Sequence, residues 1–340
     1  MFDVITIGGA TRDIFFKTDD DWIFKNGDPL KPALICLEYG AKIIPKEVHF
    51  SFGGGAVNAA ISFSRLGLKT GTIISLGNDE NSDIILKHLK NEKVNVSQVK
   101  CHGACRTGSS VFIVDKKGDH TALLYRGNND NLRIKDWSFL KNTKYIYITS
   151  LTGDSDKILS DLEKRLNPKV KIAWNPGSVQ LKKGFKGLKN LLLKTDVLIL
   201  NKDEAFELVL SKIKDHALKG VEDAVLELKC WGPKIVVVTD GKNGAYAFDG
   251  KYLFFVPPLK TRLLDSTGAG DAFGSSFIAG LEIYKKDIKK SLALAMVNAS
   301  SVVSHYGAQN GLLKIDKAED LETKAQRLIK KTKESLVCEV

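Results

Sequence analysis

The sequence has few cysteines and no long apolar run. Its five cysteines are odd in number and irregularly spaced, so the chain lacks a regular disulfide framework, and we expect reduced thiols. No stretch approaches the ~18 consecutive apolar residues of a membrane-spanning helix, and the N-terminal residues lack the basic segment and cleavage site of a signal peptide. These absences predict a cytoplasmic protein with no membrane partner.

Several nucleotide-binding signatures are also absent. The chain contains neither the G-x-x-x-x-G-K-[ST] motif of P-loop enzymes nor the H-R-D and D-F-G motifs of protein kinases. Gly8-Gly9 follows the first apolar run, but it lacks the G-x-G-x-x-G pattern of dinucleotide-binding proteins. The sequence has no internal repeats, low-complexity tracts or flexible linkers, so nothing marks a second independent domain.

The chain has little acidic charge relative to its basic charge. It carries 51 Lys and Arg against 40 Asp and Glu, a formal net charge of +11. The lysines are scattered, for example at 182–183, 285–286 and 330–331, in stretches typical of solvated helix faces and loops. A net positive charge affects solubility and non-specific attraction before it indicates recognition of a particular partner, so we expect no nucleic-acid partner. A nucleic-acid-binding protein stays an alternative that a salt-dependent DNA shift would reveal.

Apolar runs alternate with helical patterns along most of the chain. The strand-like runs are residues 3–8, 71–76, 145–149, 170–174, 197–200 and 235–239. Continuous apolar strands separated by helices are typical of a mostly parallel sheet that is covered on both faces. The sequence therefore predicts the α/β class.

Two segments depart from this alternation. Residues 17–52 contain short strand-like runs but no helix, which is more than a connection needs, and we interpret them as a small β lid. The pattern over residues 108–125 indicates a hairpin that neighbours the lid. The α/β core is then residues 1–16 and 53–316, followed by an amphipathic C-terminal helix, 317–340, that packs on it. An exposed β lid is a candidate surface for a homodimer.

Glycines and a carboxylate come together near the C-terminal third. Gly268 and Gly270 allow the backbone to turn tightly and approach a ligand, and apolar residues recur at helical spacing from Phe273 to Tyr284. The amides and dipole of a helix N-terminus attract anions, and Asp271 lies in the first turn. We expect this carboxylate to keep the ordinary pKa of about 3.9 and to be ionised at pH 7. An anion site beside a base indicates phosphoryl transfer to a hydroxyl.

Polar side chains and glycines also follow other predicted strands. Asp13 comes after the first strand, where ligands gather in α/β sheets; it suits a polyol, although a loop aspartate or helix cap fits equally. Gly54 and Gly55 open a patterned helix that carries Asn58, whose carboxamide can both donate and accept; a tight turn with a solvent-facing Asn is the alternative. Arg126 belongs to a polar cluster that meets either ligand or solvent.

The run 198–200 ends at Asn201, and Glu204 follows three residues later. Both side chains then lie near the carboxyl end of a strand, which suits Mg²⁺ held through water, because this ion prefers oxygen ligands and keeps several waters. The same spacing also suits a helix N-cap in which the two residues cap each other. Spacing alone leaves both interpretations open.

Together these elements resemble the ribokinase-like carbohydrate kinases, the PfkB family. The resemblance covers about residues 3–315 and is carried, in chain order, by Gly53-Gly54-x-x-x-Asn58, Asn201-x-x-Glu204 and Asp265-x-Thr267-Gly268-Ala269-Gly270-Asp271. It implies a three-layer sandwich with a mostly parallel central sheet and a small β lid. It also implies an enzyme that uses ATP and Mg²⁺ to phosphorylate an alcohol group.

The resemblance also implies roles for individual residues. Asp271 matches the catalytic base, and the anion hole matches the amides of Gly268, Ala269 and Gly270. The nucleotide-side positions are Asn201, Thr239, Gly241, Gly244 and Asn298, and the sugar-side positions are Asp13, Gly54 and Asn58. Gly55 stands where ribokinases usually have lysine. Asp265 and Gly307 match a monovalent-cation site, for which K⁺ is the candidate, although Gly311 replaces a polar residue there.

The class of acceptor is open between a sugar and a nucleoside. A sugar site is small and polar, whereas a nucleoside site needs an apolar slot, which Phe16, Trp22, Phe50 and Phe52 in the predicted lid could provide. An alternative of another class is a non-catalytic sensor of sugars or nucleotides, because fold does not imply function. A sensor needs no base, so the presence of Asp271 favours an enzyme.

Overall fold

A computed structural model describes residues 1–18, 23–25, 33–103, 105–115, 120–213, 218–315, 324, 327–329 and 333–336. Its largest element is a nine-stranded sheet with the order β17-β16-β15-β14-β13-β12-β11-β1-β6. The strands are β1 (Phe2–Ile7), β6 (Thr70–Ile73), β11 (Thr143–Ile148), β12 (Lys171–Trp174), β13 (Val197–Asn201), β14 (Ile235–Thr239), β15 (Ala245–Phe248), β16 (Tyr252–Val256) and β17 (Lys333–Leu336). Neighbouring strands from β6 to β14 are parallel, and the remaining pairs are antiparallel.

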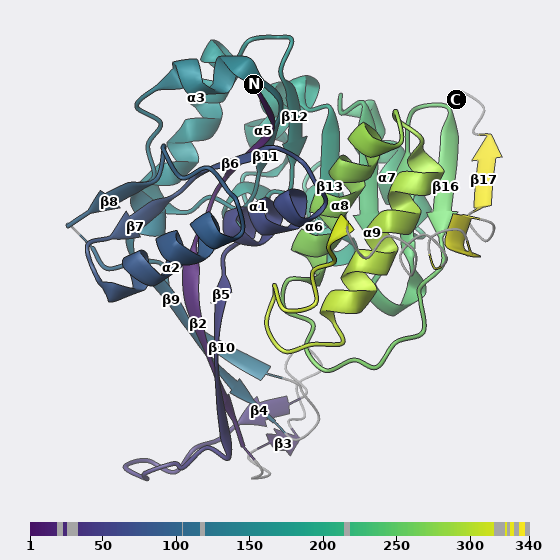
Figure 1. The fold of residues 1–340 in the computed structure, drawn as a ribbon. Helices are drawn as coiled ribbons and strands as arrows, with labels where there is room; N and C mark the ends of the chain where they lie inside the picture. The colour runs from purple at the N-terminus through teal and green to yellow at the C-terminus, as the bar shows by residue number, and fades with distance from the viewer. Residues whose placement is uncertain are drawn as a thin grey trace.

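Helices cover both faces of this sheet, as Figure 1 shows. One face packs against α3 (Lys157–Arg165), α4 (Ser178–Leu181), α5 (Gly184–Lys194), α6 (Lys202–Leu210) and α7 (Val221–Cys230). The other packs against α1 (Gly55–Arg65), α8 (Ala269–Ile283) and α9 (Ile288–Val302). Trp174 is fully buried in the first core and Phe277 in the second. The predicted α/β class with a mostly parallel sheet is confirmed.

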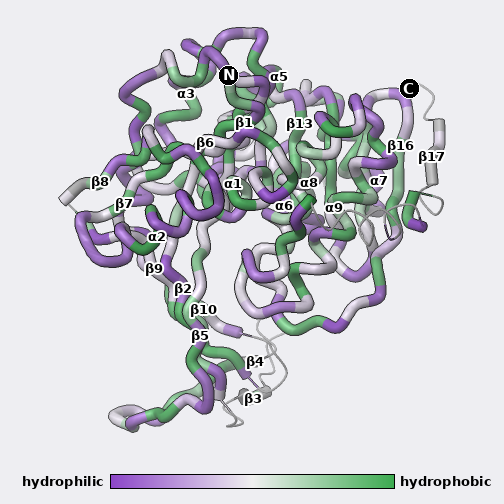
Figure 2. The backbone as a smooth tube through the Cα atoms, viewed as in Figure 1, coloured by the Kyte–Doolittle hydropathy of each residue, from purple (hydrophilic) through white to green (hydrophobic). Residues whose placement is uncertain are grey.

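A smaller four-stranded sheet has the order β10-β9-β2-β5. Its strands are β2 (Thr11–Lys17), β5 (Glu47–Gly53), β9 (Gly108–Val114) and β10 (His120–Tyr125). It projects away from the three layers, with β3 (Ile23–Lys25) and β4 (Ala33–Ile35) near its far end (Figure 1). Apolar segments continue from the layers onto this projecting sheet (Figure 2).

Shorter elements connect these layers. Helix α2 (Glu80–Asn91) packs beside α1, and β7 (Ser75–Gly77) pairs with β8 (Lys100–His102). The 3₁₀ turns are η1 (Gly127–Asn131), η2 (Trp137–Asn142), η3 (Gly153–Asp156) and η5 (Gly241–Asn243). None of the helices in the described part of the chain is both long and apolar enough to cross a membrane.

The structure differs from the predicted organisation at three places. The small sheet begins at Thr11, not at residue 17, because β2 pairs with both β5 and β9. The run 71–76 is split between β6 and β7, which belong to different sheets. The prediction of a single C-terminal helix over 317–340 is wrong for residues 333–336, which form β17 and pair with β16. Residues 327–329 of that segment are helical. Most of that segment lies outside the described residues.

Candidate active site

The N-terminus of α8 is built around two glycines with different surroundings. Gly268 is the N-cap, and its φ of 77° lies in the left-handed region that favours glycine. A Cβ there would come within 2.3 Å of the Ala308 Cβ, so the backbone is tightly packed. A Cβ on Gly270 would meet nothing within 4 Å. Open space therefore lies beside the first turn of the helix.

The amides of this turn are only partly free to bind an anion. The first helical hydrogen bond runs from the Ala272 N–H to the Gly268 carbonyl at 2.9 Å, so the N–H of Gly270 precedes the hydrogen-bonded ladder. The Ala269 N–H donates to the Ser266 carbonyl at 3.2 Å. Of the three amides predicted for the anion hole, that of Ala269 is thus engaged in a turn in this structure.

Asp265 fastens the loop before α8 to the segment after α9. Its Oδ1 accepts from the Thr267 N–H and its Oδ2 accepts from the Gly307 N–H, each at 2.8 Å. The predicted pair Asp265 and Gly307 is thus brought together through a hydrogen bond. A monovalent cation at this position stays a prediction.

The Asp271 carboxylate is held by a residue from a distant helix. Its Oδ2 accepts a hydrogen bond of 2.8 Å from Nδ2 of Asn58, which is 213 positions away on α1. Burial raises the pKa of Asp271, and the Asn58 hydrogen bond opposes that shift. This direction differs from the expectation of an ordinary pKa, and its cause is the packing of α1 against α8 around this partly buried residue.

The start of α1 places Asn58 by close backbone packing. Gly54 is the N-cap with a φ of 88°, and a Cβ there would come within 2.4 Å of the Gly9 carbonyl oxygen. A Cβ on Gly55 would come within 2.9 Å of the Thr149 Cβ. These glycines let α1 approach the ends of β1 and β11. Asn58 itself is buried, so the alternative of a solvent-facing Asn is wrong.

Asp13 lies in β2, on the small sheet beside the start of α1. A Cβ on Gly53 would come within 2.0 Å of the Asp13 Oδ2. Burial raises the pKa of Asp13, the hydroxyls of Thr11 and Ser110 lower it, and the negative charge of Asp265 adds to the rise. Its Oδ1 is buried and accepts no hydrogen bond from any described residue. A buried acceptor without a donor is costly, so this oxygen is suited to a ligand hydroxyl.

A cavity of about 360 Å³ lies beside the α8 N-terminus. Its lining includes the predicted nucleotide residues Thr239, Gly241 and Gly244, which meet Ala269 and Gly270 there. Apolar side chains complete the walls, namely Leu259, Leu263, Phe273, Met296 and Val303. An apolar slot that ends at a helix N-terminus suits a nucleotide base with its phosphates.

Asn298 does not line this cavity. It is 0% exposed, its Nδ2 contacts the hydroxyls of Ser276 at 2.6 Å and Ser62 at 3.3 Å, and its Oδ1 accepts from the Leu313 N–H at 3.0 Å. The periodicity of α9 turns this amide into the core between three helices, so it does not face the cavity. Its place near the adenine stays a prediction. Arg126 is exposed, at the N-cap of η1.

Asn201 and Glu204 cap each other. The Asn201 Oδ1 accepts from the Glu204 N–H and the Glu204 Oε2 accepts from the Asn201 N–H, each at 2.9 Å. This is the capping box of α6, so the cap interpretation is confirmed. Burial is the main cause that raises the pKa of Glu204, with further contributions from the charges of Glu207, Asp271 and Asp203. Within the described ranges there is no cluster of three or more His, Cys, Asp or Glu side chains that could hold a metal by themselves.

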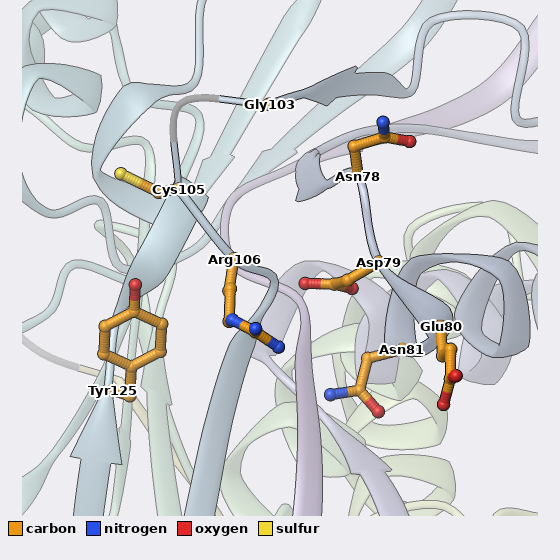
Figure 3. A pocket seen from close by; sticks show the side chains of 8 residues that line it. All are labelled: Asn78, Asp79, Glu80, Asn81, Gly103, Cys105, Arg106 and Tyr125. Carbon is orange, nitrogen blue, oxygen red and sulfur yellow. The ribbon is translucent and has the colours of Figure 1, made fainter.

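A different cavity of about 740 Å³ lies at the N-terminus of α2, lined by Asn78–Asn81, Gly103, Cys105, Arg106 and Tyr125 (Figure 3). It shares no lining residue with the cavity beside α8. Asp79 caps α2 through the Ser82 N–H at 3.0 Å and also accepts from the N–H and the hydroxyl of Thr107, both at 2.7 Å. Its carboxylate is thus used in the fold, and the chemistry is better placed at Asp271.

Two residues that sequence reasoning missed complete the surroundings of Asp271. Gln309 donates from Nε2 to the Asn58 Oδ1 at 2.7 Å, and its Oε1 contacts the His88 Nε2 at 2.8 Å. Neither residue belongs to a motif quoted above. No local pattern reveals them, because the contacts depend on how α1, α2 and the segment after α9 pack together.

Relatives of this chain match it over most of its length. The family model described as pfkB family carbohydrate kinase matches residues 29–315. An uncharacterized sugar kinase from Archaeoglobus fulgidus is 28% identical over 256 residues, 74% of this chain and 98% of the relative. An ATP-dependent 6-phosphofructokinase from Thermoanaerobacterium thermosaccharolyticum is 28% identical over 294 residues, 83% of this chain and 88% of the relative.

Solved structures share the fold. Ribokinase from Thermotoga maritima matches with a TM-score of 0.78 at 21% identity, over 95% of this chain and 100% of that one. The nucleoside kinase of Methanocaldococcus jannaschii, an archaeal member of the ribokinase family, matches with a TM-score of 0.75 at 21% identity, over 96% and 98%. The predicted ribokinase-like sandwich is thereby confirmed.

Proposed function

Because the chain belongs to the pfkB family of carbohydrate kinases, we propose that it transfers the γ-phosphoryl group of ATP to a hydroxyl group of a sugar. The observation that carries this proposal is the position of Asp271. The cavity lined by Thr239, Gly241 and Gly244 also reaches Ala269 and Gly270, which directly precede Asp271 in the chain. Asn58 links it to the start of α1, beside which lies the unpaired oxygen of Asp13.

Asp271 is the proposed general base. It accepts the proton of the sugar hydroxyl while that oxygen bonds to the γ-phosphorus and the bond from phosphorus to the bridging oxygen of ADP breaks. The raised pKa of this carboxyl makes it a stronger base than an exposed aspartate. Negative charge spread over the transferred oxygens is stabilised by the Gly268 and Gly270 amides and the α8 dipole, and one such donor is typically worth ~3 kcal/mol.

Asn201 and Glu204 are the proposed residues for Mg²⁺, held through water. Glu204 uses Oε2 in the cap, which leaves its other carboxylate oxygen for a hydrated ion. The neighbouring acidic charges that raise its pKa also favour a cation at this place. When bound, the ion would neutralise phosphate charge.

The surroundings of Phe52 support a sugar over a nucleoside as the acceptor. Phe52, one of the aromatic residues predicted for a base slot, is stacked on His88 with ring centroids 4.1 Å apart, so it is used in packing. Trp22 lies outside the described residues. Phe50 is 62% exposed and is the observation that keeps a nucleoside as the second candidate, because a base could cover it.

A panel of acceptors tests the proposal. We would measure ADP release with ATP and Mg²⁺ in the presence of pentoses, hexoses, hexose phosphates and nucleosides. We expect one sugar to give a kcat/KM about a hundredfold above any nucleoside. Turnover with nucleosides alone would overturn the sugar assignment. Tight binding of sugars without acceptor-dependent ADP release would instead indicate a sensor.

A further inference from the structure

A line of side-chain hydrogen bonds leads away from Asp271 into the molecule. Asn58 donates to Asp271 at 2.8 Å, Gln309 donates to Asn58 at 2.7 Å, and the His88 Nε2 lies 2.8 Å from the Gln309 Oε1. These residues come from α8, α1, the segment after α9, and α2. Asn58 and Gln309 are 4% and 3% exposed, so water does not replace these partners.

The charge of Asp271 sets the direction of every bond in this line. An ionised carboxylate only accepts, so Asn58 must turn its NH₂ group toward Asp271 and its oxygen toward Gln309. Gln309 must then present its own NH₂ group to Asn58 and its oxygen to residue 88. Residue 88 must therefore donate, which a histidine with a proton on Nε2 does.

We infer that His88 is a positioning residue: through Gln309 it holds the Asn58 amide in the orientation that donates to Asp271. This inference rests on the proposed role of Asp271 as the base. Without a donor at residue 88, the side-chain oxygen of Gln309 has no hydrogen-bond partner on α2, so nothing favours this orientation of the amide. A flip of Gln309 would place two amide oxygens face to face and turn the Asn58 amide away from the carboxylate.

The surroundings of Gln309 and His88 are built to hold this geometry. The Arg65 guanidinium donates to the backbone carbonyls of Gln309 at 2.8 Å and Leu312 at 3.1 Å, and it forms a two-bond pair with Glu92. The imidazole of His88 stacks on the Phe52 ring of β5. The main chain and the ring are thus fixed independently, so the side-chain orientation of Gln309 depends on its two hydrogen-bonding partners.

Substitutions at residue 88 distinguish the effect of losing the N–H donor from the effect of losing the aromatic ring. His88→Phe keeps an aromatic ring for Phe52 but removes the N–H, whereas His88→Gln offers an amide N–H at a similar reach. Lys87→Ala, on the exposed face of the same helix, is the matched control. We expect His88→Phe to lower kcat by about tenfold, because small misplacements of a catalytic group have effects of this size or larger. The KM for ATP should stay unchanged, and His88→Gln and Lys87→Ala should keep most of the wild-type kcat.

A double-mutant cycle with Asn58→Ala tests the route of the effect. If His88 acts through Asn58, adding His88→Phe to Asn58→Ala lowers kcat by much less than tenfold. A full tenfold loss in that background, an unchanged kcat of His88→Phe, or no rescue by His88→Gln would overturn the inference. The proposed role of Asp271 fails separately, if Asp271→Asn keeps a tenth or more of the wild-type rate. The free energy of unfolding of the same four proteins, measured with urea, reports the coupling between residues 58 and 88 without an activity assay. Additive effects of the two substitutions on that free energy would also overturn the inference.

Discussion

The carboxyl groups of Asp13, Glu204 and Asp271 are perturbed in the same direction. Burial is the largest cause for each, and it raises each pKa. Ionised groups in such places are costly when nothing binds them, so these residues are better explained by binding and chemistry than by stability. In the proposed reaction they would meet a sugar hydroxyl, a hydrated cation and the transferred proton.

Replacing Asp271 with Asn tests the base. Asp271→Asn keeps the shape and an acceptor for Asn58 but removes the group that takes the proton. We expect kcat to fall roughly 10²- to 10⁴-fold, with a melting temperature at or above that of the wild type because a partly buried charge is gone. Asp83→Asn, an exposed residue of α2, is the control. A variant that keeps a tenth of the rate would remove Asp271 from this role.

The pH dependence of kcat/KM, which reports groups of the free enzyme, follows from the same carboxyl. The base form is lost when the pH falls through its pKa, and because burial raises this pKa, the acid limb should lie above the ~3.9 of an exposed aspartate. Asn58→Ala removes a hydrogen bond that lowers the pKa of Asp271, so the limb should move further up. Profiles of kcat/KM against pH, measured for both proteins, check this. An acid limb of the variant at or below that of the wild type contradicts the argument.

At the scale of the element, the two glycines of the first turn of α8 serve different purposes: Gly268 serves stability and Gly270 serves function. Gly268 needs its left-handed backbone and has no room for a side chain, whereas Gly270 has both helical backbone and open space. The same substitution should therefore have opposite effects at positions only two residues apart.

Alanine substitutions measure this difference. Gly268→Ala should lower the free energy of unfolding by about 1–3 kcal/mol. Gly270→Ala should raise it by up to ~1 kcal/mol, because alanine is the better helix former, yet lower kcat at least tenfold by placing a methyl group where phosphate would bind. Urea unfolding and steady-state kinetics on both variants give the comparison. Full activity of Gly270→Ala would move the phosphate path elsewhere.

One substitution in the capping box of α6 distinguishes the capping role of Glu204 from its proposed role in binding Mg²⁺. Glu204→Gln keeps an oxygen that accepts from the Asn201 N–H but removes the charge. We expect the melting temperature to be unchanged and the Mg²⁺ concentration for half-maximal activity to rise about tenfold. Glu207→Gln, an exposed acid on the same helix, should have a smaller effect. An unaltered Mg²⁺ requirement in Glu204→Gln would leave this pair with the capping role alone.

At the scale of the whole molecule, the small sheet carries an exposed apolar edge. Strand β10 lies at the edge of that sheet, and its Leu123 and Leu124 are 63% and 53% exposed. Exposed apolar edges are places where sheets pair with other chains. This edge belongs to the hairpin predicted beside the lid and supports a homodimer there, whereas a dimer through residues 17–52 stays a prediction.

Light scattering after size-exclusion chromatography tests the dimer. The wild type should have twice the mass of one chain, and the double substitution Leu123→Lys with Leu124→Lys should shift it to a monomer, because charges at an apolar contact lose more solvation than they recover. Leu193→Lys on α5, also exposed at 59%, is the matched control and should leave the mass unchanged. A wild-type monomer at micromolar concentration contradicts the prediction.

Local patterns were enough for the elements that carry the chemistry. The helix after Gly268 and the position of Asp271 in its first turn depend on neighbours within four residues, so spacing specifies them. The box formed by Asn201 and Glu204 is equally local, but its spacing alone suited both a cap and a metal site. The alternation of apolar strands with helices likewise specified the layered α/β class. The family resemblance added the order of the sites along the chain.

Long-range packing decided the rest. The raised pKa of Asp271 requires α1 to cover α8, Asn298 is a core amide only because three helices meet around it, and β17 exists as a strand only on the edge of β16. Asp271 is linked directly to Asn58, and through it to Gln309 and His88, all far away in the chain. Burial and hydrogen bonding between such distant residues arise when the layers assemble, so no window of sequence contains them.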